Sequence, residues 1–350
     1  MMASMIVLMG TALSAVIALY VSSQTGARAN GDVLLGVSLP AYALKDKAVL
    51  GLVAEYRRAY LLHGLCFALL ILPALFLMEQ FSLAMVYFSL WFLALLYVHL
   101  KILHAYFARL YALKVEKQWR VGSHGMIAID TEVSRLKHTF MLSWKWFLLP
   151  LLILLVPILN NVFAQEEVLP WAIIVTGLVV LGLFCFIYLG IDRMGTKTYS
   201  VHTEINLQLN YTFKSQWSKC VIILAVLSSF FYVLLLYATE AESLVLVYAG
   251  IFVYLFVMIL IVVLSHRKIR RERNGLLGGE EGEVSKDDDR YWIGGILYNN
   301  PNDRSLFVEK RMGIGMTMNI GTWGGKLIAV GVVLLLLVPI GFGVWTVFGS

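Results

Sequence analysis

Long runs without any charged residue alternate along this chain with connecting segments that hold the ionisable groups. A helix needs roughly 20 apolar residues to cross the hydrocarbon core of a bilayer. Only 14% of the residues are charged and 60% are hydrophobic, whereas about a quarter of the residues of a soluble domain are charged, so a water-soluble enzyme is excluded. The sequence predicts an all-α polytopic membrane protein with eight transmembrane helices. The expected spans are residues 2–22, 61–78, 81–100, 140–159, 169–191, 220–239, 244–265 and 327–348.

The positions of lysine and arginine predict the orientation of these spans. All 28 Lys and Arg residues lie in the first, third, fifth and seventh connections, when Lys145 at the edge of the fourth span is counted with the third. The only charged residues of the second, fourth and sixth connections are acidic. Because cytoplasmic loops are enriched in basic residues, we expect the odd connections to be cytoplasmic and both termini to lie outside. A cytoplasmic face that is rich in basic residues attracts anionic lipid headgroups.

The seventh connection is long enough to form a small cytosolic element, so we expect three parts. Residues 1–265 would form a seven-helix membrane domain, residues 266–326 a cytosolic linker and small domain, and residues 327–350 the eighth transmembrane helix. The connection opens with a basic run and a linker rich in glycine and acids, followed by β-prone stretches separated by turn residues. These stretches predict a small β-containing insert before the last helix. Because it is too short to bury a core alone, we expect it to pack on helix ends or on a partner.

The third span is expected to continue as a helix beyond the membrane. Over residues 100–118, lysines and arginines are interleaved with leucine and phenylalanine at helical spacing. This pattern predicts a basic amphipathic stalk on the cytoplasmic side.

The chain carries no recognisable catalytic, cofactor or metal motif. Its histidines form no His-Glu-x-x-His sequence, and Gly313 and Gly315 lack the third glycine of a dinucleotide fingerprint. The cysteines fall within spans or at their ends, which indicates packing residues and no disulfides. We therefore predict no enzymatic activity, no cofactor, no metal site and no direct contact with nucleic acid.

The spans contain no charged residue away from their ends, which disfavours an ion-coupled transporter. A transporter or permease for an apolar or lipid-like compound stays open as an alternative function.

Several segments of the seventh connection resemble a small domain of unknown function that occurs near the end of bacterial multi-spanning proteins. The resemblance is carried by residues 289–292, the turn at 298–303, residues 306–311 and residues 313–315, together with residues 35–40 after the first span. Those proteins are similar to a wider group that includes the SdpI-like immunity proteins. The understood members of that group protect against a membrane-active toxin and hold a cytosolic repressor at the membrane. The resemblance implies a bacterial plasma-membrane location and supplies no catalytic residues.

Our first hypothesis is accordingly a plasma-membrane protein of the envelope stress, immunity or signalling type that acts by binding. Its basic cytoplasmic face would engage membrane lipids, anionic on that side, or a soluble cytosolic regulator. The sequence makes no prediction of the oligomeric state. The candidate partner-binding residues are Arg267, Arg270, Arg271, Arg273, Tyr291, Trp292, Lys310 and Arg311.

Overall fold

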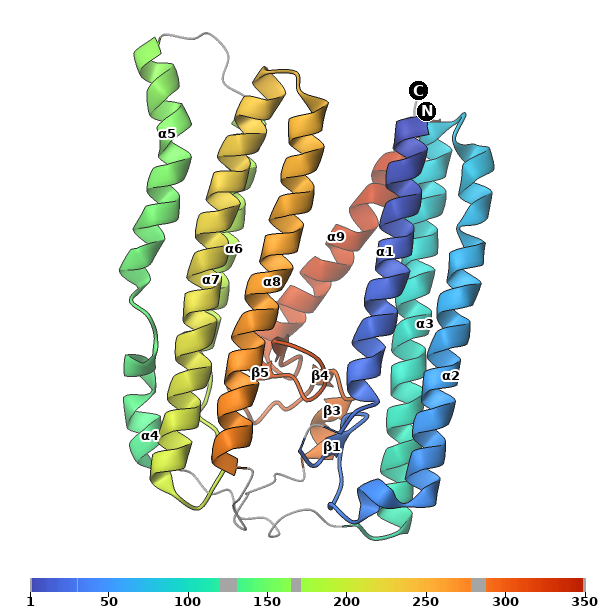
Figure 1. The fold of residues 1–350 in the computed structure, drawn as a ribbon, viewed down its shortest axis with the longest axis vertical. Coiled ribbons are helices and arrows are strands. Elements are labelled where there is room, and N and C mark those ends of the chain that lie inside the picture. Colours follow the sequence, from blue (N-terminus) through green and yellow to red (C-terminus); the bar gives the residue numbers. More distant parts are fainter. Residues whose placement is uncertain (1, 30, 120–130, 165–170, 278–287, 349–350) are drawn as a thin grey trace. The chain divides into compact units, whose positions relative to one another are not determined.

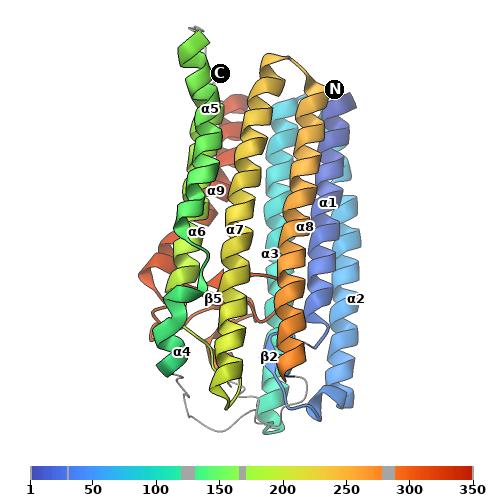
Figure 2. The same ribbon diagram turned by 60° about the vertical axis from the view of Figure 1, so that its left-hand side comes forward.

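The structure, a computed structural model, is mostly helical and divides into two compact units. It describes residues 2–29, 31–119, 131–164, 171–277 and 288–348. One unit is formed by residues 1–124 with 285–350, and the other by residues 125–284. Each unit is built from long helices that lie side by side (Figures 1 and 2).

Among the described residues, six helices are long and apolar enough to cross a membrane. The chain is therefore a multi-pass membrane protein, as its composition predicts. The six candidate spans are Leu8–Gly26, Lys47–Leu77, Ser82–Glu116, Trp171–Arg193, Thr203–Glu240 and Val245–Leu277. The fourth and eighth expected spans coincide with shorter apolar stretches, residues 144–160 and 323–334. The number of eight spans and their orientation stay predictions.

The first unit is a helical bundle whose central member is α3. Its helices are α1 (Met2–Gly26), α2 (Lys47–Leu70), α3 (Phe81–Glu116) and α9 (Trp323–Phe348), with the 3-10 turns η1 (Ala43–Lys45) and η2 (Leu72–Leu77) on either side of α2. Helix α2 packs against α1 and α3, and α3 also packs against α9. Helix α1 begins and α9 ends at the same end of this unit, the upper end in Figure 1.

Short antiparallel hairpins lie toward the other end of the first unit. They are β1 (Val33–Leu34) with β2 (Val37–Ser38), β3 (Trp292–Ile293) with β4 (Leu297–Tyr298), and β5 (Phe307–Glu309) with β6 (Met316–Met318); the turn η5 (Asp289–Tyr291) precedes β3. The predicted β-containing segment near the C-terminus is confirmed. The β1–β2 hairpin between α1 and α2 was not predicted, because two-residue strands leave little alternation to detect.

The C-terminal hairpins share a hydrophobic core with the helices of the first unit. Val37, Tyr56, Leu110 and Trp292 belong to one cluster of buried residues. The small segment thus packs on the ends of α2 and α3, which is one of the two arrangements expected for an element too short to fold alone.

The second unit is built around α7. Its elements are α4 (Thr131–Leu136), η3 (Lys137–Phe140), η4 (Trp144–Phe147), α5 (Leu148–Ala164), α6 (Trp171–Arg193), α7 (Thr203–Glu240) and α8 (Leu244–Leu277). Helix α7 packs against α5, α6 and α8 (Figure 2). The fourth expected span starts at residue 140, but regular α-helix begins only at Leu148, with Pro150 in its first turn, where proline is tolerated.

Several helices are longer than a bilayer requires. At 1.5 Å per residue, the 36 residues of α3 extend about 54 Å, against a hydrocarbon core of roughly 30 Å. The predicted helical stalk is confirmed as far as Glu116. Helix α8 likewise continues through the basic run at residues 266–273 to Leu277. Arginine, lysine and glutamate are good helix formers, so this run is part of a helix.

Candidate functional site

One buried carboxylate joins distant segments of the first unit. Asp289 begins η5, and its side chain is 1% exposed. The Lys114 ammonium on α3 donates to Asp289 Oδ2 at 2.6 Å, and the backbone N–H of Ser38 donates to Oδ1 at 3.1 Å. Arg311, after β5, donates to the same Oδ1. Three segments of the chain are thereby tied to one side chain.

The Arg311 guanidinium completes this cluster. Its side chain is 8% exposed and donates to Asp288 and, at 2.8 Å, to the carbonyl oxygen of Gly36. The Trp292 ring lies beside it, 5.0 Å from guanidinium carbon to ring centroid. Lys114 and Arg311 are balanced by Asp288 and Asp289, and buried charges are tolerated only when paired in this way. We call these four residues the ion cluster.

Two glycine turns allow the cluster to form. Leu35 and Gly36 connect β1 and β2 with φ values of 49° and 82°, as in a two-residue hairpin turn with both central residues left-handed. Gly295 in the β3–β4 turn has φ 71°. A Cβ on Gly36 would lie 2.5 Å from Gly295 Cα, so the two turns can touch only because glycine, which has no side chain, occupies both positions.

The start of α9 is fixed by Asn319. This side chain is fully buried, and its amide nitrogen donates to the carbonyl oxygens of Asn300 and Asp303 at 2.9 and 2.8 Å. Its side-chain oxygen accepts from the N–H groups of Asn300 and Gly321 at 3.0 Å each. All its hydrogen-bonding groups are used, so the turn at 299–303 is locked to the entry of α9.

A line of buried aromatic and histidine side chains crosses between α2 and α3. The Tyr60 hydroxyl donates to the carbonyl oxygen of His99 at 2.9 Å, and His63 Nε2 lies 3.3 Å from the carbonyl oxygen of Leu95. His99 Nδ1 is buried and has no hydrogen-bond partner among the described residues. Within the part of the chain that the structure describes, no group of three or more His, Cys, Asp and Glu residues could hold a metal ion.

The candidate partner-binding residues separate into two sets. Tyr291, Trp292, Lys310 and Arg311 lie in the first unit, where Trp292 and Arg311 are brought into contact. Trp292 is buried and the Arg311 side chain is largely covered, and burial lowers the pKa of the half-buried Lys310. Trp292 and Arg311 thus contribute to the packing of the terminal segment, and a partner-binding role for the four residues stays a prediction.

The second set lies on the extension of α8 in the other unit. Arg267, Arg270 and Arg271 are exposed, and no described residue forms an ion pair with them. The opposite side of this extension packs inward: Ile269 is buried, and the Arg273 guanidinium lies 5.4 Å from the centroid of the Tyr199 ring. The helix therefore presents one packed side and one cationic side.

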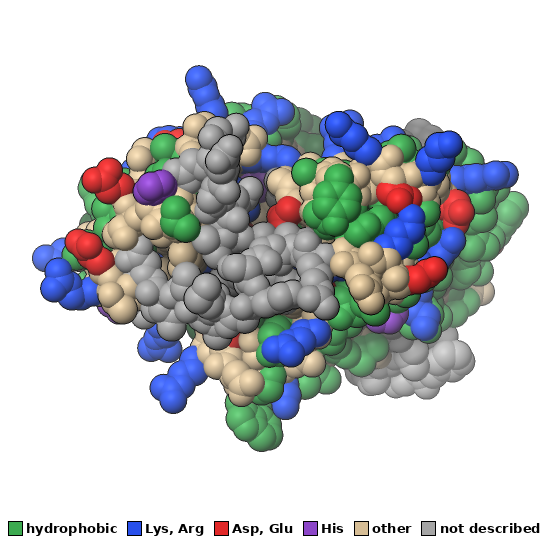
Figure 3. Space-filling view, turned by 90° about the horizontal axis from the view of Figure 1, so that it is seen from below, with side chains coloured by type: hydrophobic (Ala, Val, Ile, Leu, Met, Phe, Trp, Pro, Cys, Tyr) green, Lys and Arg blue, Asp and Glu red, His purple; other side chains and the backbone are tan. Residues whose placement is uncertain are grey.

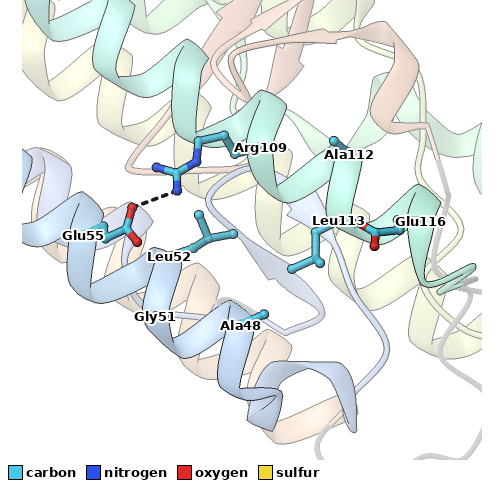
Figure 4. Close-up of a pocket in the computed structure, with 8 residues that line it drawn as sticks. All are labelled: Ala48, Gly51, Leu52, Glu55, Arg109, Ala112, Leu113 and Glu116. Carbon is cyan, nitrogen blue, oxygen red and sulfur yellow. Dashed lines mark ion pairs between the residues drawn. The ribbon is translucent and has the colours of Figure 1, made fainter.

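An open groove lies between α2 and α3 in the first unit (Figure 4). Its volume is about 500 Å³. The Arg109 guanidinium lies 2.8 Å from the Glu55 carboxylate across one end of it. The lining residues are Ala48, Gly51, Leu52, Glu55, Arg109, Ala112, Leu113 and Glu116.

Sequence reasoning missed the members of the ion cluster other than Arg311. Lys114 fits the pattern of a solvated basic stalk, and Asp288 and Asp289 continue an acid-rich linker, so nothing in their local sequence marks them as buried. The available signal was the pair of short segments, 35–40 and 289–292, that carry the same family resemblance although they lie far apart in the chain.

One comparison with known proteins matches part of the C-terminal segment. The model of a family of unknown function, DUF5808, matches residues 301–326, which comprise the β5–β6 hairpin and the first turn of α9. No curated protein and no solved structure matches the chain. The fold and this match define a multi-pass helical membrane protein that carries a domain of unknown function. They provide no link to the SdpI-like proteins.

Proposed function

We propose that this chain is a binding protein of the bacterial plasma membrane, with both termini outside and its basic face in the cytoplasm. In this proposal it serves envelope stress, immunity or signalling, the class that the family resemblance implies. Its basic face engages anionic lipid headgroups or a cytosolic partner. In Figure 3, which looks from below Figure 1, Lys and Arg side chains project from the face that is drawn.

The cationic side of α8 is the observation that carries the proposal. The apolar part of this helix, residues 244–265, extends about 33 Å, which matches the hydrocarbon core. Arg267, Arg270 and Arg271 follow within about 9 Å along the helix axis, so they lie within the headgroup layer, about 5 to 8 Å deep, or at its outer edge. Because each basic residue near an anionic surface contributes about 1 kcal/mol, three exposed arginines at this depth favour anionic lipids substantially.

The orientation has two further supports. All Lys and Arg residues lie in odd connections. In the first unit, α1 begins and α9 ends at the same end (Figure 1), as required of a chain whose termini share one side of the membrane.

The lipid contact is tested with the purified full-length protein in detergent. Native mass spectrometry would compare the retention of phosphatidylglycerol and phosphatidylcholine on the wild type and on the triple variant Arg267→Gln, Arg270→Gln, Arg271→Gln. We expect the wild type to retain phosphatidylglycerol preferentially and the variant to lose that preference. The control is Arg28→Gln, Arg58→Gln, Arg304→Gln, which removes the same charge from other exposed positions.

Equal retention of both lipids by the wild type would contradict this function. An equal loss of preference in the control would show that α8 is not the contact. Crosslinking in native membranes distinguishes binding of a cytosolic protein partner from binding of lipids alone. Substrate-dependent flux in proteoliposomes would instead favour the permease alternative.

A further inference from the structure

The groove between α2 and α3 lies well past the predicted end of the third span. Ala112 follows Leu100, the end of the expected third span, by 12 residues of continuous helix, or about 18 Å. The headgroup layer adds only about 5 to 8 Å on each side of the hydrocarbon core. With the third span ending at Leu100, as the sequence predicts, the groove faces water at the end of the first unit where α2 begins and α3 ends.

The floor of the groove is apolar and its walls are low. Leu52 is buried at the floor and Leu113 lies half-buried beside it, while Ala48, Gly51 and Ala112 leave the space between the helices open (Figure 4). A Cβ on Gly51 would meet no atom within 4 Å. A leucine-sized side chain from outside would thus reach an apolar surface that is otherwise in water.

The residues that line the groove carry a net negative charge, whereas basic residues prevail elsewhere in the predicted cytoplasmic connections. Arg109 is paired with Glu55 and also lies over the Tyr106 ring. Glu116 is exposed and forms no ion pair with any residue that the structure describes. Glu55 and Glu116 outnumber Arg109, so the lining carries one net negative charge. Glu116 lies one helical turn from Ala112, on the same side of α3.

We propose that this groove is the docking site for a helical segment of a cytosolic protein that inserts one large apolar side chain and places a lysine or arginine one turn away, against Glu116. An acidic segment is repelled by Glu116, and a wholly polar segment leaves the leucine floor in water. This inference names the partner chemistry for the binding role proposed above and rests on the basic end being cytoplasmic.

The probe is a labelled 15-residue helical peptide with one leucine and, four residues later, one lysine on an alanine–glutamine background. Binding would be measured by fluorescence anisotropy to the full-length protein in nanodiscs of phosphatidylcholine, against empty nanodiscs. We expect saturable binding that is lost when the peptide leucine is replaced by serine. Gly51→Leu should weaken binding tenfold or more by filling the groove, and it should not impair folding, because leucine is the better helix former. Gly275→Leu on α8, where a Cβ also meets nothing within 4 Å, is the matched control and should bind like the wild type.

A charge exchange makes the test specific. Glu116→Lys should weaken binding of the lysine peptide and strengthen binding of a version with glutamate in place of lysine. Glu132→Lys on α4 should change neither affinity. No binding above the serine peptide, an unchanged affinity in Gly51→Leu, or no inversion in Glu116→Lys would each overturn the proposal. If the peptide does not bind and the protein instead forms a homodimer that Gly51→Leu disrupts, the groove would be an interface with a second copy. That outcome would also overturn the proposal. Because the nanodiscs are neutral, loss of lipid preference through α8 leaves these results unaffected.

Discussion

The ammonium nitrogen of Lys114 lies 2.6 Å from Asp289 Oδ2, across 175 residues of sequence, and both side chains are almost fully buried. The Glu55–Arg109 pair has nearly the same separation, 2.8 Å, but its side chains are about half exposed. The two ion pairs have similar lengths but contribute differently to stability. The exposed pair is screened by water, whereas the burial of Lys114 and Asp289 is tolerated because their charges are paired.

Lys114→Met should destabilise the first unit strongly. Removal of one partner leaves Asp289 with less compensation in a buried site, and broken buried pairs cost about 3–5 kcal/mol. The exposed counterpart, Arg109→Met, should cost about 0–1 kcal/mol. Urea-induced unfolding of both variants in one detergent gives the comparison, and equal losses would show that the ion cluster does not hold the terminal segment.

Gly36→Ala should also loosen the terminal segment, through sterics and not through charge. The left-handed conformation alone costs a residue with a Cβ roughly 1–2 kcal/mol, and the new Cβ would press on Gly295 Cα at 2.5 Å. Gly275→Ala, on a helix with open space around it, should be neutral or slightly stabilising. Limited proteolysis measures the effect as faster cleavage in residues 288–322, and a cleavage rate like that of Gly275→Ala would refute this account.

His99→Phe should leave stability unchanged or raise it. His99 Nδ1 is buried without a partner among the described residues, and an unsatisfied buried polar group costs about 1–3 kcal/mol. Tyr60→Phe removes a hydroxyl that donates to the His99 carbonyl oxygen, so it should lower stability by about 1 kcal/mol. Thermal unfolding would rank the two variants, and a large loss in His99→Phe would mean that the imidazole has a role that packing does not explain.

Periodic features of this chain were predictable from sequence, and single long-range contacts were not. Long apolar runs and the helical spacing over residues 100–118 correctly indicate spans and a stalk, because both repeat over many residues. Arg311 was singled out as a candidate partner-binding residue, and its side chain, 8% exposed, contacts Asp289 and Trp292. Its role depends on Gly36 and Lys114, which are distant in the sequence, and no local pattern encodes such a meeting. The groove is equally hidden, since Gly51 and Ala112 are unremarkable until α2 and α3 pack together.

Asp46 should make the start of α2 sensitive to acid. Its carboxylate accepts from Lys117 Nζ at 2.6 Å and from the N–H of Ala48 at 2.8 Å, and these contacts, Lys117 first, hold the pKa of Asp46 below its usual value of 3.8. A lowered carboxyl pKa contributes stability that is present above pH 3.8 and is lost as the pH falls through the folded-state pKa. Asp46→Asn keeps a helix cap of similar quality and loses only the ion pair, whereas Asp46→Ala loses both. Thermal unfolding between pH 7 and pH 2 should therefore rank wild type, asparagine and alanine in that order near neutral pH. The wild type and the asparagine variant should converge in acid, and a gap between them that persists at pH 2 would contradict this assignment.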